Sequence, residues 1–381
     1  MKERDTIPVI APTAALIAGH RDNNFDILRI FAAALVIMAH SWALTGTPGE
    51  PIATLGLGVP DGGTLGVWIF FTISGYLVSR SFVQRDNLFA FIEARLLRIY
   101  PAFVACLLFG LLVGLAVTPM PWRDYWAHPQ TQDYLLSNLV YDLRYRLPGV
   151  FTSNPLPNAV NGSIWSLPAE TMMYVLVALM GTLTLLRRTW AAAVTLIGLL
   201  TIATLDPDAV MQIHFIDTSS LTPTISCFLL GMLLFALRER VPLHGGVVIA
   251  LMAAILLLKQ YQPPGRMLVC VTVAYTALWL ALHRRVRLPV PDRIGDISYG
   301  LYLYAYPIQQ TLVWLMPGVR PPVLFAAAFA VTSVVAWVSW HLLEKKALKL
   351  KGRISSHLNL RRQRNPQNVA AARVYKKAKS E

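Results

Sequence analysis

The sequence predicts an all-α fold, a polytopic transmembrane helical bundle of about ten spans with both termini cytoplasmic. Hydrophobic residues make up 55% of the 381 residues, and charged residues only 14%. Apolar stretches of about 20 residues recur along the chain, and a helix of that length crosses the hydrocarbon core of a bilayer. The predicted spans cover residues 25–44, 64–83, 97–118, 164–186, 189–205, 221–237, 246–261, 265–283, 296–316 and 321–342.

Basic residues are concentrated on one side of these spans. The connections 45–63 and 206–220 contain no Lys or Arg, whereas residues 80–98 contain four arginines. Because cytoplasmic loops are enriched in Lys and Arg, residues 80–98 and both termini are predicted to be cytoplasmic. The predicted segments are a cytoplasmic N-terminus 1–24 before an uncleaved signal-anchor, a transmembrane domain 25–345 with a long extracytoplasmic loop 119–163, and a basic cytoplasmic tail 346–381. The aromatic-rich loop is expected to fold as a cap that could contact sugar.

Composition also limits the function classes. A net charge of +14 could indicate nucleic-acid binding. However, a basic tail beside the last span is expected from topology and from attraction to anionic lipid, and it lacks the interleaved aromatic residues of a strand-binding surface. The three cysteines, Cys106, Cys227 and Cys270, lie in apolar stretches without CxxC spacing, so neither a disulfide framework nor a metal site is indicated.

The first predicted span carries two ionisable residues, Arg29 and His40. An arginine near the centre of a membrane helix costs about 3 kcal/mol on insertion scales, so such residues usually have a function. Eleven positions correspond to three turns plus about 20°, which places both side chains on one face, about 16 Å apart. The simpler alternative for each residue is a hydrogen bond between neighbouring helices.

Three further residues are predicted to lie near the two ends of this helix. Glu170 is placed one to two turns below the outer surface, in the same layer as His40, where it could orient His40 as a catalytic base. Arg95 and Arg98 are neighbours on one helix face at the start of the third predicted span. Guanidinium groups near a helix N-terminus suit a phosphate ester, although positive-inside topology also explains them.

A ligand that connects both ends of the first span would place phosphates at Arg29, Arg95 and Arg98 and a reactive group near His40. Coenzyme A has this form, with an anionic nucleotide and a long pantetheine arm that ends in a thioester. Acyl transfer from a thioester needs a base and a dipole for the developing oxyanion, but no metal or ATP. The alternative is a membrane transporter or exporter of a glycan or small anion, for which the sequence shows no internal repeat.

Several motifs occur in an order typical of one family. They are Arg29 followed eleven positions later by His40, GVWIFFTISGYLVSRS at 66–81, RLLRIYP at 95–101, NGSIWSLPAE at 161–170, GDISYGLYLYAYP at 295–307 and WHLLEKKALKL at 340–350. Over residues 22–350 the chain therefore resembles the acyltransferase-3 family of membrane O-acyltransferases, which acylate surface and exported carbohydrates. The resemblance implies that His40 is catalytic, that Glu170 belongs to the site, and that Arg29, Arg95 and Arg98 bind the donor acyl-CoA.

The resemblance also implies a location and a set of partners. We expect an acetyl-CoA-dependent enzyme of the bacterial inner membrane that uses no metal and acts on polysaccharide, exopolysaccharide, lipopolysaccharide or another glycan. Its partners would be acyl-CoA, the carbohydrate acceptor and membrane lipid, with no nucleic acid and with a homo-oligomer left open. The chain departs from the family pattern at Tyr304, Ala305 and Tyr306, where many members have a His. For His341 and Glu344, interfacial anchoring is an adequate explanation.

Four residues are candidate substrate contacts that also have simpler interpretations. Ser74 and Tyr76 lie on either side of a glycine in the second span, where small residues more often allow close helix packing. Trp165 and Ser166 begin the fourth span and could meet a sugar, although a tryptophan at that depth is also typical of the aromatic belt.

Overall fold

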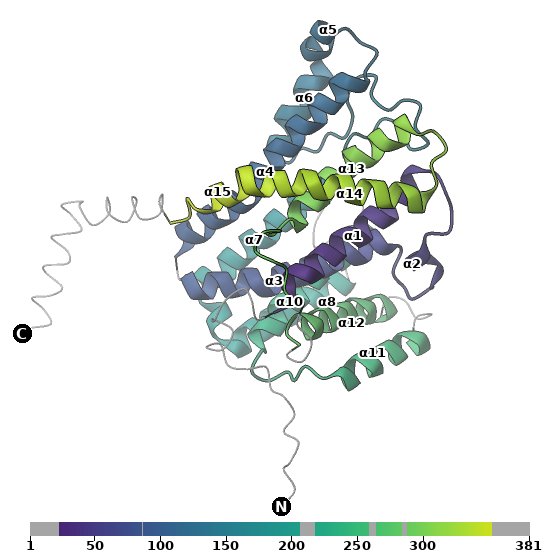
Figure 1. The fold of residues 1–381 in the computed structure, drawn as a ribbon. Coiled ribbons are helices and arrows are strands. Elements are labelled where there is room, and N and C mark those ends of the chain that lie inside the picture. Colours follow the sequence, from purple (N-terminus) through teal and green to yellow (C-terminus); the bar gives the residue numbers. More distant parts are fainter. Residues whose placement is uncertain (1–22, 86, 206–217, 259–263, 284–287, 353–381) are drawn as a thin grey trace, which may run out of the picture.

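The computed structural model describes residues 23–85, 87–205, 218–258, 264–283 and 288–352, and Figure 1 shows their arrangement. Every regular element in these ranges is helical, and they contain no β-strand. The predicted all-α class is therefore confirmed for this part of the chain. Most of the predicted N-terminal segment and basic tail lie outside the described residues, and the segment boundaries stay predictions.

The helices are joined mostly by short connections. The α-helices are α1 (Phe25–Leu44), α2 (Pro51–Thr54), α3 (Gly62–Arg85), α4 (Leu88–Val117), α5 (Trp122–Ala127), α6 (Pro129–Leu139), α7 (Leu167–Thr182), α8 (Thr189–Leu205), α10 (Thr218–Ala236), α11 (Gly245–Leu258), α12 (Pro264–Ala281), α13 (Ser298–Leu315), α14 (Pro321–Ser339) and α15 (Lys345–Leu348). Short 3-10 turns precede and follow α7, at Ser163–Ser166 and Leu185–Arg187, and a π-helical segment, Trp340–Glu344, joins α14 to α15.

Several of these helices can cross a membrane, which makes the chain an integral membrane protein. Among the described residues, five helical stretches are long and apolar enough: Phe25–Leu44, Gly62–Arg85, Leu88–Val117, Ser163–Thr182 and Pro321–Leu348. Four shorter apolar helices lie at Thr189–Ile202, Leu221–Ala236, Gly245–Leu258 and Arg266–Ala281. The prediction of about ten spans and the cytoplasmic position of both termini stay predictions.

Helix α3 packs against both α1 and α10, and glycines allow the close approach. A Cβ atom on Gly75 of α3 would lie 2.1 Å from the carbonyl oxygen of Phe228 in α10. Conversely, a Cβ on Gly231 of α10 would lie 2.2 Å from the carbonyl oxygen of Thr72. The two backbones therefore touch directly, as small residues permit in membrane helices. Gly75 therefore serves close helix packing, which is the simpler interpretation of this glycine.

Helix α4 begins earlier than the hydropathy pattern predicts. Asn87 caps it, because the Asn87 side-chain oxygen accepts a hydrogen bond of 3.0 Å from the backbone nitrogen of Ala90. The helix therefore includes the polar residues that precede the apolar run, and Arg95 lies about 10 Å from the helix start. The prediction that Arg95 and Arg98 lie near a helix N-terminus is wrong, so free backbone N–H groups do not assist them.

The long loop 119–163 contains α5 and α6, which lie at the top of Figure 1. Buried amides hold it in place. Asn138 donates a hydrogen bond of 2.9 Å to the carbonyl oxygen of Arg144, and Asn154 donates one of 2.7 Å to the side chain of Gln310 in α13. The loop is therefore folded, as expected, whereas its extracytoplasmic position as a cap and its contact with sugar stay predictions.

Gly75→Ala is expected to lower the melting temperature of the purified protein in detergent, because the new methyl group overlaps the carbonyl of Phe228. Overpacking of this kind costs about 1–3 kcal/mol. Gly198→Ala is the matched control, since Gly198 is also inside a helix and a Cβ there meets nothing within 4 Å. That control is expected to be neutral or slightly stabilising. Equal melting temperatures for the two variants would contradict the close contact.

Candidate functional site

Two cavities lie at opposite ends of α1. One has a volume of about 1050 Å³ and includes Arg29 in its lining. The other has a volume of about 640 Å³ and includes His40. We name them the inner cavity and the outer cavity, following the predicted topology. The two ionisable residues of the first span therefore each line a space large enough for part of a substrate.

The inner cavity is strongly basic. Its lining contains seven cationic side chains and four carboxylates. The three arginines that the sequence singled out lie together in it. An excess of positive charge in a cleft attracts polyanions. The cationic residues are Arg29, Arg80, Arg85, Arg95, Arg98, Lys345 and Lys351.

Asp296, just before α13, joins two of these arginines. Its Oδ2 atom accepts hydrogen bonds from Arg29 at 2.9 Å and from Arg98 at 2.6 Å, and the Ser298 hydroxyl donates to Oδ1 at 2.7 Å. Burial by itself raises the pKa of the Asp296 carboxyl. The two guanidinium groups and the hydroxyl outweigh burial and hold this pKa well below its ordinary value. Asp296 therefore stays ionised and links α1 to α4.

The π-helical segment brings a second carboxylate to Arg98. Glu344 is only 1% exposed, its Oε2 atom lies 3.8 Å from Arg98 Nη1, and its Oε1 atom accepts a hydrogen bond of 3.2 Å from Ser339. A π-helical turn inserts an extra residue into a helix and is frequent at functional sites. The interpretation of Glu344 as an interfacial anchor is therefore wrong.

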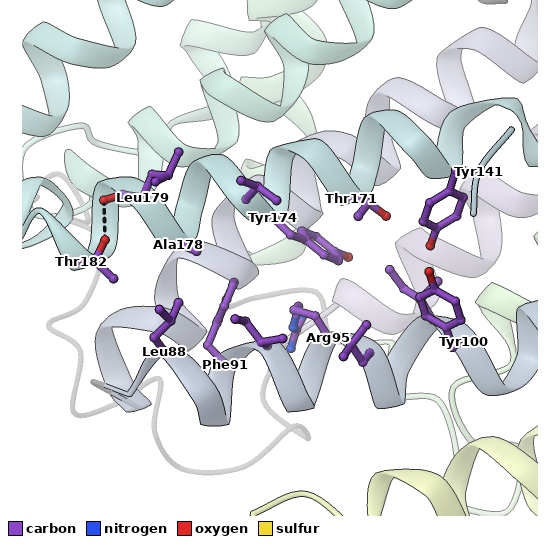
Figure 2. Close-up of a pocket in the computed structure, with 14 residues that line it drawn as sticks. Leu88, Phe91, Arg95, Tyr100, Tyr141, Thr171, Tyr174, Ala178, Leu179 and Thr182 are labelled. Atoms are coloured by element: carbon purple, nitrogen blue, oxygen red, sulfur yellow. Dashed lines mark hydrogen bonds between the residues drawn. The ribbon is translucent and has the colours of Figure 1, made fainter. Parts of the chain in front are cut away.

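Arg95 differs from the other two arginines, because no carboxylate pairs with it among the described residues. Its guanidinium lies over the rings of Phe91 and Tyr174, 5.8 and 5.6 Å from their centroids. Figure 2 shows it pointing from α4 toward Tyr174 of α7, in an apolar groove of about 250 Å³. Arg95 and Tyr174 also line the inner cavity. The charge of Arg95 is therefore available to an anion there.

Glu170 lines the inner cavity, whereas His40 lines the outer one. The Oε1 atom of Glu170 accepts hydrogen bonds from the hydroxyls of Tyr174 and Ser74, the latter at 3.4 Å. The predicted pairing of Glu170 with His40 is not observed, because the predicted depth assumed that the chain enters the protein near Asn161. Asn161 is already buried and donates to a backbone carbonyl of α13 at 3.0 Å. Helix α7 thus starts deep and carries Glu170 to the inner cavity.

His40 lies in the outer cavity beside an aromatic ring. Its imidazole packs edge-on against Tyr306, with ring centroids 5.1 Å apart. Its Nδ1 atom is buried and has no hydrogen-bond partner within the described part of the chain. Trp165, a predicted sugar contact, and Asp61 line the same cavity. The His40 side chain as a whole is partly exposed, so its ring can reach a substrate hydroxyl in this cavity.

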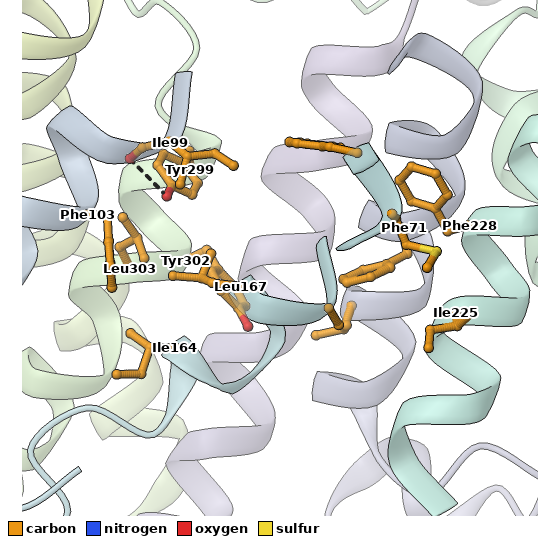
Figure 3. Packing of buried hydrophobic residues seen from close by; sticks show 14 of the residues in the cluster. Phe71, Ile99, Phe103, Ile164, Leu167, Ile225, Phe228, Tyr299, Tyr302 and Leu303 are labelled. Carbon is orange, nitrogen blue, oxygen red and sulfur yellow. Dashed lines mark hydrogen bonds between the residues drawn. The ribbon is translucent and has the colours of Figure 1, made fainter. Parts of the chain in front are cut away.

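A thin packed wall separates the two cavities. Along α3, Val67 lines the outer cavity and Ser74 lines the inner cavity. Along α13, Tyr302 lines the outer cavity and Tyr299 lines the inner cavity. The two residues of α13 are one turn apart, about 4.5 Å along the axis. In the wall, Phe70 meets the Tyr302 ring edge-on with 5.9 Å between centroids. Figure 3 shows Tyr302 within the buried core that extends across the bundle to α10.

Two of the predicted substrate contacts have structural positions instead. Ser166 is buried, and its hydroxyl forms a hydrogen bond of 2.6 Å with the hydroxyl of Tyr302, which fixes the wall. Tyr76 is buried between Phe25 and Phe235, with ring centroids 6.0 and 5.6 Å away. Neither residue is in the lining of the two cavities. The packing interpretation therefore applies to Tyr76.

Sequence reasoning missed two inner-cavity residues, Asp296 and Lys351. The available signal for Asp296 was its position directly before an apolar run at the basic end of the protein, where an acidic residue needs a cationic partner. Lys351 follows the last helix and was counted only as part of a basic tail. Burial lowers the pKa of the Lys351 ammonium to about 8, and the positive charges of Arg95, Arg85 and Arg98 act in the same direction.

Membrane-length helices around a basic cavity and a histidine-containing cavity define an integral membrane protein with room for an anionic substrate. Residues 22–341 match the acyltransferase domain of the acyltransferase-3 family. This match covers most of the chain, so the chain belongs to the acyltransferase-3 family and is an acyltransferase. The predicted family and enzyme class are confirmed, and the transporter alternative is set aside.

Two relatives are similar over nearly their whole length. The O-acetyl transferase of Shigella phage Sf6 is 28% identical over 342 residues, which cover 86% of this chain and 97% of that protein. Nodulation protein 10 of Rhizobium leguminosarum bv. viciae is 29% identical in an alignment 402 residues long, and the alignment covers 90% of this chain and 97% of that protein. No solved structure matches the chain.

Asp296→Asn is expected to destabilise the protein by about 2 kcal/mol, because two largely buried arginines lose the charge between them. Since the pKa of Asp296 is lowered, its contribution is complete above the ordinary Asp pKa of about 4 and is lost only as pH falls further. The difference in melting temperature should therefore be constant from about pH 8 to about pH 5 and shrink in more acidic buffer. Asp133→Asn is the control.

Asp133 also pairs with an arginine, Arg144 at 2.8 Å, but both side chains are well exposed, at 48% and 36%. Exposed ion pairs contribute little to stability, so this control should melt close to the wild type. Equal losses in the two variants would show that Asp296 has no special role in holding α1 and α4 together.

Anion binding in the inner cavity is expected to depend on pH. With a pKa of about 8, Lys351 is mostly charged at neutral pH and loses its proton as pH rises through 8. The Michaelis constant for an anionic substrate should therefore rise several-fold between about pH 7 and about pH 9. Lys351→Arg should keep the constant flat over this range, because arginine stays protonated. A wild-type profile that matches Lys351→Arg would rule out the contribution of Lys351.

Proposed function

We propose that this acyltransferase moves an acyl group, acetyl in the first instance, from acyl-CoA to a hydroxyl group of a carbohydrate. The donor binds in the inner cavity from the cytoplasm. The acceptor, a unit of polysaccharide, lipopolysaccharide or another glycan, enters the outer cavity from the other side of the bacterial inner membrane. The name of the Shigella phage relative, O-acetyl transferase, supports transfer to oxygen.

The observation that carries the proposal is the placement of two different cavities at the two ends of one helix. The inner cavity is rich in arginine and lysine, which bind phosphate groups well. The outer cavity is lined by His40, whose partly exposed imidazole can act as a base or nucleophile. Arg29 and His40 are about 16 Å apart along α1, a distance that a pantetheine arm can cover.

The thin wall must open for this reaction, and Phe70 and Tyr302 are the side chains that the arm would displace. Tyr302 is held by hydrogen bonds of 2.6 Å to the Ser166 hydroxyl and to the carbonyl oxygen of Ser163. These bonds tie the ring to the segment that precedes α7. The wall therefore favours a closed state without donor and keeps water away from the thioester.

His40 has two possible roles in the transfer. As a general base, it takes the proton of the acceptor hydroxyl while the oxygen attacks the thioester carbonyl and the thiolate leaves. As a nucleophile, it first carries the acyl group and then passes it to the hydroxyl. In both routes the proton finally goes to the CoA sulfur or to solvent. The described residues contain no group of three His, Cys, Asp or Glu side chains that could hold a metal ion, and neither route needs one.

The decisive experiment uses sealed vesicles of known orientation, radiolabelled acetyl-CoA and a panel of candidate glycans. Base-labile label is expected on glycan only when acetyl-CoA is supplied at the cytoplasmic face and glycan at the opposite face. His40→Ala should remove transfer while expression and insertion stay normal. His341→Ala, a histidine outside both cavity linings, is the control and should retain activity. Transfer supported only by donor at the extracytoplasmic face, or an active His40→Ala protein, would overturn the proposal.

Arg95→Ala is expected to raise the Michaelis constant for acyl-CoA about tenfold to a hundredfold, because one charge-assisted contact of about 1.5–3 kcal/mol is lost. Arg95→Lys should recover part of the affinity, since a point charge cannot reproduce the planar guanidinium. Arg188→Ala is the control, because Arg188 is exposed and outside the cavity lining. An unchanged Michaelis constant in Arg95→Ala would mean that the donor does not use this cation.

A further inference from the structure

The outer cavity has the opposite electrical character to the inner one. Two carboxylates, Glu50 and Asp61, line it, and no lysine or arginine is present among the described residues of its lining. No cation pairs with either carboxylate in the described part of the chain. Their negative charge is therefore not neutralised locally and acts on whatever enters.

Both carboxylates are fixed by backbone groups at the rim of the cavity. Glu50 accepts hydrogen bonds from the backbone nitrogens of Ala53 at 2.7 Å and Gly62 at 3.2 Å. Asp61 accepts from the backbone nitrogen of Thr64 at 2.8 Å and from its hydroxyl at 3.0 Å. Because these bonds favour one position for each side chain at the starts of α2 and α3, a ligand in the cavity meets both negative charges.

The rest of the lining suits an uncharged sugar. Trp42 and Trp165 line the cavity and are partly exposed. Aromatic faces pack against apolar C–H surfaces, and fixed carboxylates accept hydrogen bonds from hydroxyl groups. A sugar carboxylate or phosphate would instead bring like charges together in a partly enclosed space, which disfavours binding.

We infer that the acceptor is an uncharged sugar and that Glu50 and Asp61 exclude uronic acids and phosphorylated sugars. This inference rests on the proposed function for its biological meaning, since it assigns the acceptor to the outer cavity. It adds a basis for substrate specificity: the inner cavity binds an anionic donor, whereas the outer cavity disfavours anionic acceptors. Neutral glycans should be favoured over matched uronic acids about tenfold or more.

The charge of the cavity can be tested without any acceptor. Ala53→Cys places a thiol on an exposed position of the lining, and the native cysteines Cys106, Cys227 and Cys270 are all buried. The test compares the rates at which this thiol reacts with a cationic and an anionic methanethiosulfonate of similar size. Thr152→Cys, on an exposed position of the outer loop, is the reference.

The ratio of the rate with the cationic reagent to the rate with the anionic reagent should be at least about tenfold higher in the Ala53→Cys protein than in the Thr152→Cys protein. Glu50→Gln with Asp61→Asn, and also high salt without these substitutions, should bring the two ratios together. Gel filtration shows whether the double variant folds. If it does not fold, the measurement in high salt still tests the effect of the two charges. Equal ratios in the unsubstituted cavity at low salt would overturn the inference.

The selection itself is tested with pairs of oligosaccharides that differ only by a carboxylate at C6, assayed with radiolabelled acetyl-CoA. Preferential labelling of the neutral member, reduced in the Glu50→Gln, Asp61→Asn variant, supports the inference. Equal labelling of both members overturns it. If no glycan is labelled at all, the proposed function fails, while the thiol reaction still decides whether the cavity repels anions.

Discussion

The shared carboxylate of Asp296 is the interaction on which the arrangement of the site depends. It binds Arg29 from α1 and Arg98 from α4, and Glu344 adds a second carboxylate from the segment after α14. Four parts of the chain that are distant in sequence therefore meet at one cluster of charges. Because α1 is one continuous helix, holding Arg29 at one end also sets the position of His40 at the other.

The three inner-cavity arginines that the sequence singled out, Arg29, Arg95 and Arg98, divide into two kinds. Arg29 and Arg98 share the carboxylate of Asp296, so part of their positive charge is compensated within the protein. Arg95 contacts the rings of Phe91 and Tyr174 and pairs with no carboxylate among the described residues. Arginines without a carboxylate partner remain available to bind an anion. The ion pairs fix the geometry of the site. The cost of holding several guanidinium groups near one another is thereby reduced.

The sequence predicted the helical class and the family. It also predicted both ends of α1, because an apolar stretch of 20 residues between polar segments is a strong and local signal. Prediction from the sequence failed where the depth of a residue in the membrane depends on tertiary packing. Hydropathy could not show that the segment before α7 is buried, so Glu170 was placed too far out. The cap at Asn87 extends α4 through polar residues, which an apolar window excludes. Asp296 and Arg29 are 267 positions apart in the sequence, so no local sequence pattern indicates that they form an ion pair.

The wall of Phe70 and Tyr302 has a consequence for the cell as well as for the reaction. A membrane protein with a solvent-filled passage from the inner to the outer cavity, and with a histidine in it, would let protons run down the electrochemical gradient. One elementary charge that crosses a membrane potential of 100 mV releases about 2.3 kcal/mol, so even a slow leak is costly to energy conservation. With the two cavities open to opposite sides of the membrane, as proposed, Phe70 and Tyr302 would prevent such a leak by keeping the cavities separate.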